Sequence, residues 1–152
     1  MGINIRRGVF ETNSSSCHSI SIKGDDHYRD DFNGEGRDLE IELGEFGWGP
    51  DLLEHPFDKL CYVLVSIQYF QPWCKTIADL VKSKEFIWLQ DIIREKIDYN
   101  LVVEENRDNF YPLGYIDHES KYLLEDLWSD CEEVFKTNMK EFIFNNKYNV
   151  II

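Results

Sequence analysis

FDKLCYVLVSIQYF, residues 57–70, is apolar around nearly the whole circumference of a helix, with charge only at Asp58 and Lys59. A helix that is hydrophobic on all sides belongs in the interior of a protein, where each face meets another element. Pro72 ends the helix, because proline lacks the backbone N–H and clashes with the preceding turn. The sequence therefore predicts a central helix, around which the other elements are arranged.

Helical periodicity returns in the second half of the chain. Three further helices are predicted over residues 76–82, 84–98 and 122–144, the last of them interrupted near Asp130. One face of the second is formed by Phe86, Leu89, Ile93 and Ile97. The apolar side of the last is predicted to include Leu123, Leu127, Val134 and Phe142.

Strands are predicted over residues 19–23, 38–43, 100–104 and 148–152. The clearest pattern is that of 38–43, where Leu39, Ile41 and Leu43 alternate with acidic residues, as in a strand with one buried face. Phe46 and Trp48, in the glycine-rich segment that follows, are expected to turn inwards. The fold class predicted is α+β, with a small, mostly antiparallel sheet packed against a layer of four to five helices. Residues 1–152 are predicted to form a single domain.

Composition and charge limit the possible functions. The 152 residues include 16 Lys and Arg against 29 Asp and Glu, a formal net charge of -13. That balance argues against direct binding to nucleic acid, which needs clustered cations, and against docking on an anionic membrane. The 4 cysteines form no CxxC pair, so neither a zinc site nor any other cofactor is predicted. With no signal-peptide pattern at the N-terminus, a cytoplasmic location is predicted.

The charge is unevenly distributed. Residues 1–23 contain three basic residues and one acidic residue, a net charge of +2, whereas the remaining residues carry -15. Cationic, hydroxyl and amide groups in the first segment suit a phosphate or carboxylate ligand. The candidate ligand-binding residues are Arg6, Arg7, Asn13, Ser14, Ser15, Ser16, His18 and Ser19. The alternative is a capped turn, in which these side chains bond only to local backbone.

A second polar segment is YIDHES, residues 115–120. Asp117 beside His118 can orient an imidazole, and Ser120 is a possible partner. If the fold brings His18 close to them, these four residues could form an acid/base site. The alternative is that Ser120 caps the start of the next helix, with Asp117 contributing nearby. No metal ligands are assigned.

The third candidate is an acidic surface that contacts a protein partner. A base-free run of carboxylates in the second half of the chain consists of Glu125, Asp126, Asp130, Glu132 and Glu133. Carboxylates spaced like phosphates can occupy a nucleic-acid-binding groove on another protein, and their field accelerates encounter with a basic partner. The alternative is a surface that only increases solubility.

RRGVFETNSSSCHS, residues 6–19, resembles the opening of an uncharacterised protein family encoded by bacteriophages and prophages of Gram-positive bacteria, R-x-V-F-E-T-N-S-S-S-x-H-S. Residues 44–48, 115–120 and 142–144 also resemble that family. No activity is established for it, so no catalytic role carries over. The resemblance implies a phage protein made in the host cytoplasm, where small acidic proteins often inhibit host machinery or immunity.

Three hypotheses follow. The first is a non-enzymatic phage inhibitor of a bacterial defence system or of host machinery. It would bind a basic host protein, such as a nucleic-acid-binding defence effector, or capture a phosphorylated nucleotide signal in residues 1–23. The second is a small enzyme acting on a nucleotide or protein through His18, His118 and Asp117, or less plausibly an ADP-ribosyl transferase using Arg6, Ser15 and Glu42. The third is a structural phage component. We favour the first hypothesis; the oligomeric state is not predicted.

Overall fold

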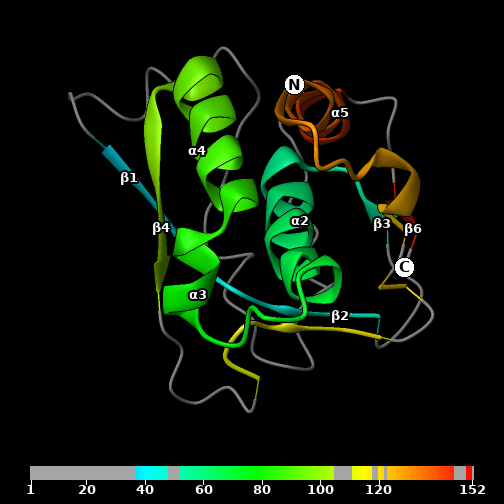
Figure 1. Cartoon of the computed structure of the whole chain (residues 1–152). Helices are drawn as coiled ribbons and strands as arrows, with labels where there is room; N and C mark the ends of the chain where they lie inside the picture. The colour runs from blue at the N-terminus through cyan, green and yellow to red at the C-terminus, as the bar shows by residue number, and fades with distance from the viewer. Residues whose placement is uncertain are drawn as a thin grey trace.

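The computed structural model describes residues 37–47, 52–104, 111–117, 120–121, 123–145 and 150–151 (Figure 1). The helical elements are α2 (Pro56–Phe70), α3 (Ile77–Lys82), α4 (Lys84–Ile97), the short 3-10 helix η4 (Glu125–Leu127) and α5 (Glu132–Phe144). The strands are β1 (Arg37–Glu42), β2 (Glu45–Phe46), β3 (Leu52–Leu53), β4 (Tyr99–Glu104), β5 (Tyr115–Ile116) and β6 (Val150–Ile151). The strand predicted over residues 19–23 lies outside the described residues.

Helix α2 occupies the centre of the molecule, between α4 and α5 (Figure 1). Every residue from Phe57 to Ile67 is buried, which confirms the sequence prediction. The helix begins after His55, whose Nδ1 accepts a hydrogen bond from the backbone N–H of Phe57 at 3.2 Å. Burial extends to Asp58 and Lys59, the two charged residues of the segment. Packing of α2 at the centre of the fold therefore buries two ionisable side chains together with the apolar ones.

Helices α3 and α4 follow as predicted. A capping box formed by Thr76 and Asp79 starts α3, and the hydroxyl of Ser83 accepts the N–H of Phe86 at 3.1 Å to start α4. Asp98, in the left-handed conformation with φ 59°, ends α4. The predicted apolar face of α4 is confirmed, since its four residues are all buried.

The last predicted helix is only partly correct. The chain is helical over η4 and α5 but not between them, so the predicted interruption near Asp130 is confirmed. Leu123 and Leu124 lie in a turn, so the helix predicted over this part of the chain is wrong at these two residues. Two members of the predicted apolar side, Leu123 and Val134, are 45% and 47% exposed. The buried face of α5 consists of Phe135, Met139, Phe142 and Ile143. The break explains the error, because helical phase does not carry across a non-helical segment.

The strands that the structure describes form three two-stranded sheets. β1 pairs with β4 and β2 with β5, both in parallel, whereas β3 pairs with β6 in antiparallel orientation. A mixed helix and strand content agrees with the α+β class, but the prediction of a mostly antiparallel sheet is wrong. The reason is the crossover: α2, α3 and α4 lie between β1 and β4 in the chain and return it to the same end of the sheet.

The sheet of β1 and β4 shows how alternation selects the core. Leu39 and Ile41 are buried, while Asp38 and Glu40, which alternate with them, are exposed. Phe46 on β2 is fully buried, as predicted, and meets Tyr62 of α2 edge-on at 5.4 Å between ring centroids. Among the described residues, none of the helices combines the length and the apolar character needed to cross a bilayer.

Candidate functional site

The acidic residues predicted to contact a partner lie on η4, in the segment before α5 and in the first turn of α5. We call Glu125, Asp126, Asp130, Glu132 and Glu133 the acidic patch. The backbone N–H of Cys131 donates to the hydroxyl of Ser129 at 3.1 Å, which shapes the turn immediately before α5. Glu132 and Glu133 occupy the first turn of the helix, where the positive end of the helix dipole favours carboxylates.

Tertiary structure divides the acidic patch into paired and unpaired carboxylates. Asp130 accepts from Lys84 Nζ at 2.7 Å, and Glu132 accepts from Lys136 Nζ at 2.6 Å. Glu125, Asp126 and Glu133 are exposed and form no ion pair with any residue that the structure describes. Two of the five carboxylates in the base-free run are therefore paired with lysines of α4 and α5.

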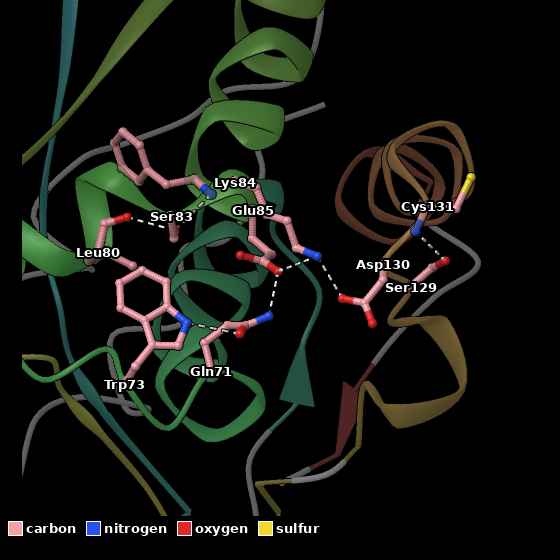
Figure 2. A network of polar contacts seen from close by, with 10 residues as sticks. Gln71, Trp73, Leu80, Ser83, Lys84, Glu85, Ser129, Asp130 and Cys131 are labelled. Atoms are coloured by element: carbon pink, nitrogen blue, oxygen red, sulfur yellow. Dashed lines mark hydrogen bonds and ion pairs between the residues drawn. The ribbon is translucent and has the colours of Figure 1, made fainter.

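Lys84 joins the acidic patch to the interior (Figure 2). Its Nζ lies 2.7 Å from Asp130 Oδ1 and 3.9 Å from Glu85 Oε1. The hydrogen bond to Asp130 is the main reason why the pKa of Lys84 is raised. Glu85 Oε1 also accepts from Gln71 Nε2 at 2.7 Å, and Trp73 Nε1 donates to Gln71 Oε1 at 3.1 Å. One polar network therefore connects α5, α4 and the turn after α2.

Two further ion pairs hold α5 against α4. Lys136 Nζ lies 2.7 Å from Asp91, and Lys140 Nζ lies 2.6 Å from Glu95. The pKa of Lys136 is raised, first by its hydrogen bond to Asp91 and then by Glu132, and the pKa of Glu95 is lowered by Lys140. All these side chains are partly exposed, so each pair adds little to stability. They show which face of α5 lies beside α4.

The described residues around Asp117 form a turn, which bears on the helix-cap alternative alone. The N–H of Asp117 donates to Phe46 O at 3.0 Å, and its own carbonyl accepts the N–H groups of Ser120 and Lys121 at 2.9 and 3.0 Å. Ser120 is buried, and its carbonyl accepts a hydrogen bond from the hydroxyl of Tyr62. No helix starts at Ser120, so the prediction of a helix cap there is wrong: the residue belongs to a turn.

Several candidate residues lie outside the described part of the chain. They include the whole set proposed for residues 6–19, among them His18, and also His118. The proposed acid/base site that joins His18, Asp117, His118 and Ser120 therefore stays a prediction. Within the ranges described above, no group of three or more His, Cys, Asp or Glu residues is arranged to hold a metal ion.

Sequence reasoning missed Lys84, Glu85 and Gln71 as neighbours of the acidic patch. They lie far from residues 125–133 in the sequence. The periodicity of α4 and α5 predicts the apolar face of each helix but not which other helix packs against it. The one available signal was a buried-face position occupied by Glu85, next to Phe86.

Comparison with protein-family models, with curated proteins and with solved structures finds no match.

Proposed function

We propose that this protein is a phage-encoded inhibitor that acts by binding, and that the acidic patch contacts a basic face of a host protein. The observation that carries the proposal is the exposure of Glu125, Asp126 and Glu133 without an ion pair to any described residue. Three unpaired carboxylates on neighbouring elements form a local negative field that favours a basic surface and repels acidic ones. The phage origin rests on the resemblance of residues 6–19.

The neighbouring contacts support this reading. Asn138 Nδ2 of α5 donates to Leu127 O of η4 at 3.1 Å, and Lys84 Nζ lies 2.7 Å from Asp130 Oδ1, so both segments that flank the exposed carboxylates contact a helix before a partner arrives. A surface that is already ordered loses less conformational entropy on binding. The expected partner is a protein with clustered Lys and Arg, such as a defence effector that normally binds nucleic acid. Its complex should form in the host cytoplasm and weaken as salt screens the charges.

The test compares two variants with the same change in net charge. Glu125→Gln/Asp126→Asn neutralises the patch, and Glu40→Gln/Glu104→Gln neutralises two exposed carboxylates on the sheet of β1 and β4, on the far side of the molecule (Figure 1). Each protein is expressed in bacteria that carry one defence system, from a panel, and the cells are challenged with a phage that the system blocks. Plaque counts report inhibition of the defence.

We expect the natural chain to restore plaques on at least one strain, the patch variant to lose that effect, and the sheet variant to keep it. Once a host partner has been isolated with the natural chain, it should associate about tenfold more slowly with the patch variant. Charges at a contact surface act mainly on the association rate. Loss of the effect in both variants would show that overall charge alone matters, and retention in both would contradict a role of the acidic patch. Failure of the natural chain on every strain would refute the inhibitor proposal.

The nucleotide-capturing version of this function was predicted for residues 6–19, and no described residue of that segment bears on it. The enzymatic alternative rests on His18 and His118 and has the same status. Neither is favoured here by a specific observation in the described residues.

A further inference from the structure

An open cavity of about 220 Å³ lies between the end of α2 and the segment that leads into β5. It is remote in sequence from the acidic patch and was not singled out by any motif. Its walls come from two parts of the chain that are joined only by the fold. They consist of Gln68, Tyr69, Cys74, Lys75, Tyr111, Pro112 and Leu113.

Hydrogen bonds hold both walls in place. Gln68 Nε2 donates to the carbonyls of Leu113 and Gly114 at 3.0 and 3.1 Å, so the end of α2 grips the opposite wall. The hydroxyl of Tyr69 donates to Ile116 O at 3.1 Å and accepts the N–H of the same residue at 3.0 Å. The cavity is therefore formed before a ligand enters, which reduces the entropy lost on binding.

The aromatic lining suits a flat ring. Tyr111 is 40% exposed and stacks on Tyr115 with 5.0 Å between centroids and 27° between planes, so its ring is held in a defined orientation. Tyr69 and Pro112 add further apolar surface. Burial raises the pKa of the Cys74 thiol to about 11, so Cys74 contributes a neutral wall at physiological pH. Any nucleic-acid base can stack on such aromatic side chains, because every base has a planar aromatic face.

Two polar groups in the lining could orient a bound ligand. Both N–H groups of the Gln68 amide are used by the opposite wall, which leaves Oε1 to accept a hydrogen bond, and no described residue donates to it. The ammonium of Lys75 forms no ion pair with any residue that the structure describes, and Lys75 is exposed at the edge. The lining thus combines an acceptor for a ring N–H or amino group with a cation for an anionic tail.

We propose that this cavity binds a mononucleotide, with the base against Tyr111, a donor group of the base on Gln68 Oε1, and the phosphate near Lys75. The volume is below the roughly 300 Å³ at which sites for larger ligands begin, so one base with its sugar partly exposed fits and a dinucleotide does not. The net charge of -13 opposes an anion at long range, but at physiological salt charges beyond about 8 Å are largely screened. At short range Lys75 attracts the phosphate while Asp79 and Glu85, which act on Cys74, repel it, so the phosphate must lie on the exposed side of Lys75.

The test uses the purified full chain, titrated calorimetrically with AMP, GMP, CMP and UMP, and with adenosine as the uncharged probe. Lys75→Gln removes the cation and Tyr111→Leu removes the ring. Tyr111→Phe keeps the ring, and Lys82→Gln removes a lysine of α3 that does not line the cavity. Thermal unfolding of each variant checks that it folds. Because Lys75 is exposed, its variant stays informative even if Tyr111→Leu disturbs the stack on Tyr115.

We expect saturable binding of at least one mononucleotide. Lys75→Gln should weaken it about tenfold and leave adenosine unaffected, as loss of one charge-assisted contact predicts. Tyr111→Leu should weaken both about tenfold through lost stacking, Tyr111→Phe should recover most of that loss because it keeps the ring, and Lys82→Gln should change neither. No saturable binding at millimolar concentrations would overturn the proposal. Binding that survives both Lys75→Gln and Tyr111→Leu would also overturn it.

This site is independent of the acidic patch. Glu125→Gln/Asp126→Asn should leave nucleotide titrations unchanged, and Lys75→Gln should leave plaque counts unchanged unless the bound nucleotide is itself the signal of the defence system. The two proposals can therefore fail separately.

Discussion

Gln71 and Glu85 are joined by a hydrogen bond of 2.7 Å between the residue that follows α2 and the first turn of α4. Glu85 is fully buried, and its second carboxylate oxygen accepts no hydrogen bond from any described residue. Gln71 also holds the indole of Trp73, so this contact ties an exposed aromatic ring to the interior. Lys84 Nζ lies near both Glu85 and Asp130, so it extends the same network to the segment before α5.

The first prediction concerns Glu85. Glu85→Ala should lower the free energy of unfolding by about 2–4 kcal/mol, because it removes a buried hydrogen bond to a charged group and leaves a cavity. Urea denaturation followed by circular dichroism measures the loss. Glu125→Ala, at an exposed carboxylate, should stay within about 0.5 kcal/mol of the natural chain. Similar stability of the two variants would mean that Glu85 contributes nothing to α2–α4 packing.

The hydroxyl of Tyr62 is a second test of the interior. Tyr62→Phe removes the donor that Ser120 O accepts and leaves a buried carbonyl without it, so a loss of about 1–3 kcal/mol is expected. Tyr111→Phe, at a 40% exposed ring, is the matched substitution and should change stability by less than about 0.5 kcal/mol. Thermal denaturation of both variants at one pH decides the question.

Gly114 should tolerate no side chain. Its φ is +70°, and an added Cβ would clash with the carbonyl oxygen of Gly44 and lie 2.9 Å from Val65 Cγ2. The left-handed conformation alone costs an L-residue about 1–2 kcal/mol, and backbone must move to relieve the clash. Gly114→Ala is expected to lose at least about 2 kcal/mol in urea titrations and to weaken nucleotide binding, because Gly114 O holds Gln68. A variant as stable as the natural chain would contradict this.

Lys59 predicts a pH dependence. Burial lowers its pKa from 10.5 to about 8, against a smaller opposing effect of Glu54. Between about pH 8 and 10.5 the unfolded chain therefore binds more protons at this residue than the folded chain, so the Lys59 contribution to stability rises with pH. The natural chain should gain stability relative to Lys59→Met across that window.

The comparison with Lys59→Met isolates this residue. The pKa values of Cys74, Tyr62 and Tyr69 are raised, so these groups destabilise the fold at high pH, but they are present in both proteins. Their effects cancel in the difference between the two unfolding free energies. Urea titrations at pH 7, 8.5, 9.5 and 10 measure that difference, and a value that does not change with pH would contradict the prediction.

Prediction from the sequence succeeded where a pattern is local. The face of α4 formed by Phe86, Leu89, Ile93 and Ile97 followed from a repeat within one uninterrupted helix. The face of α5 did not, because the chain leaves the helix between η4 and α5 and the phase is lost, so that Val134 is exposed and Phe135 is buried. The prediction of antiparallel strands was wrong for a related reason. The alternation in β1 indicates a buried face but does not identify the partner strand, and the crossover through three helices is what places β4 parallel to it.

The candidate site shows the same division. The run of carboxylates from Glu125 to Glu133 is visible in the sequence, but its pairing is not. Lys84 reaches Asp130 only because α4 packs beside α5. The cavity beside Tyr111 is absent from any motif, since its two walls are more than thirty residues apart along the chain.

The sequence by itself determined that residues 57–70 form a buried central helix, because a helix apolar on all sides has no favourable place in water. It also determined the acidic character of the chain and the alternation of β1. Only the tertiary structure decided which helices and strands meet, because hydrophobic burial rewards the amount of apolar surface removed from water and does not name the partner. That choice leaves three carboxylates of the acidic patch without an ion pair to any described residue and places Lys75 beside the cavity that Tyr111 lines.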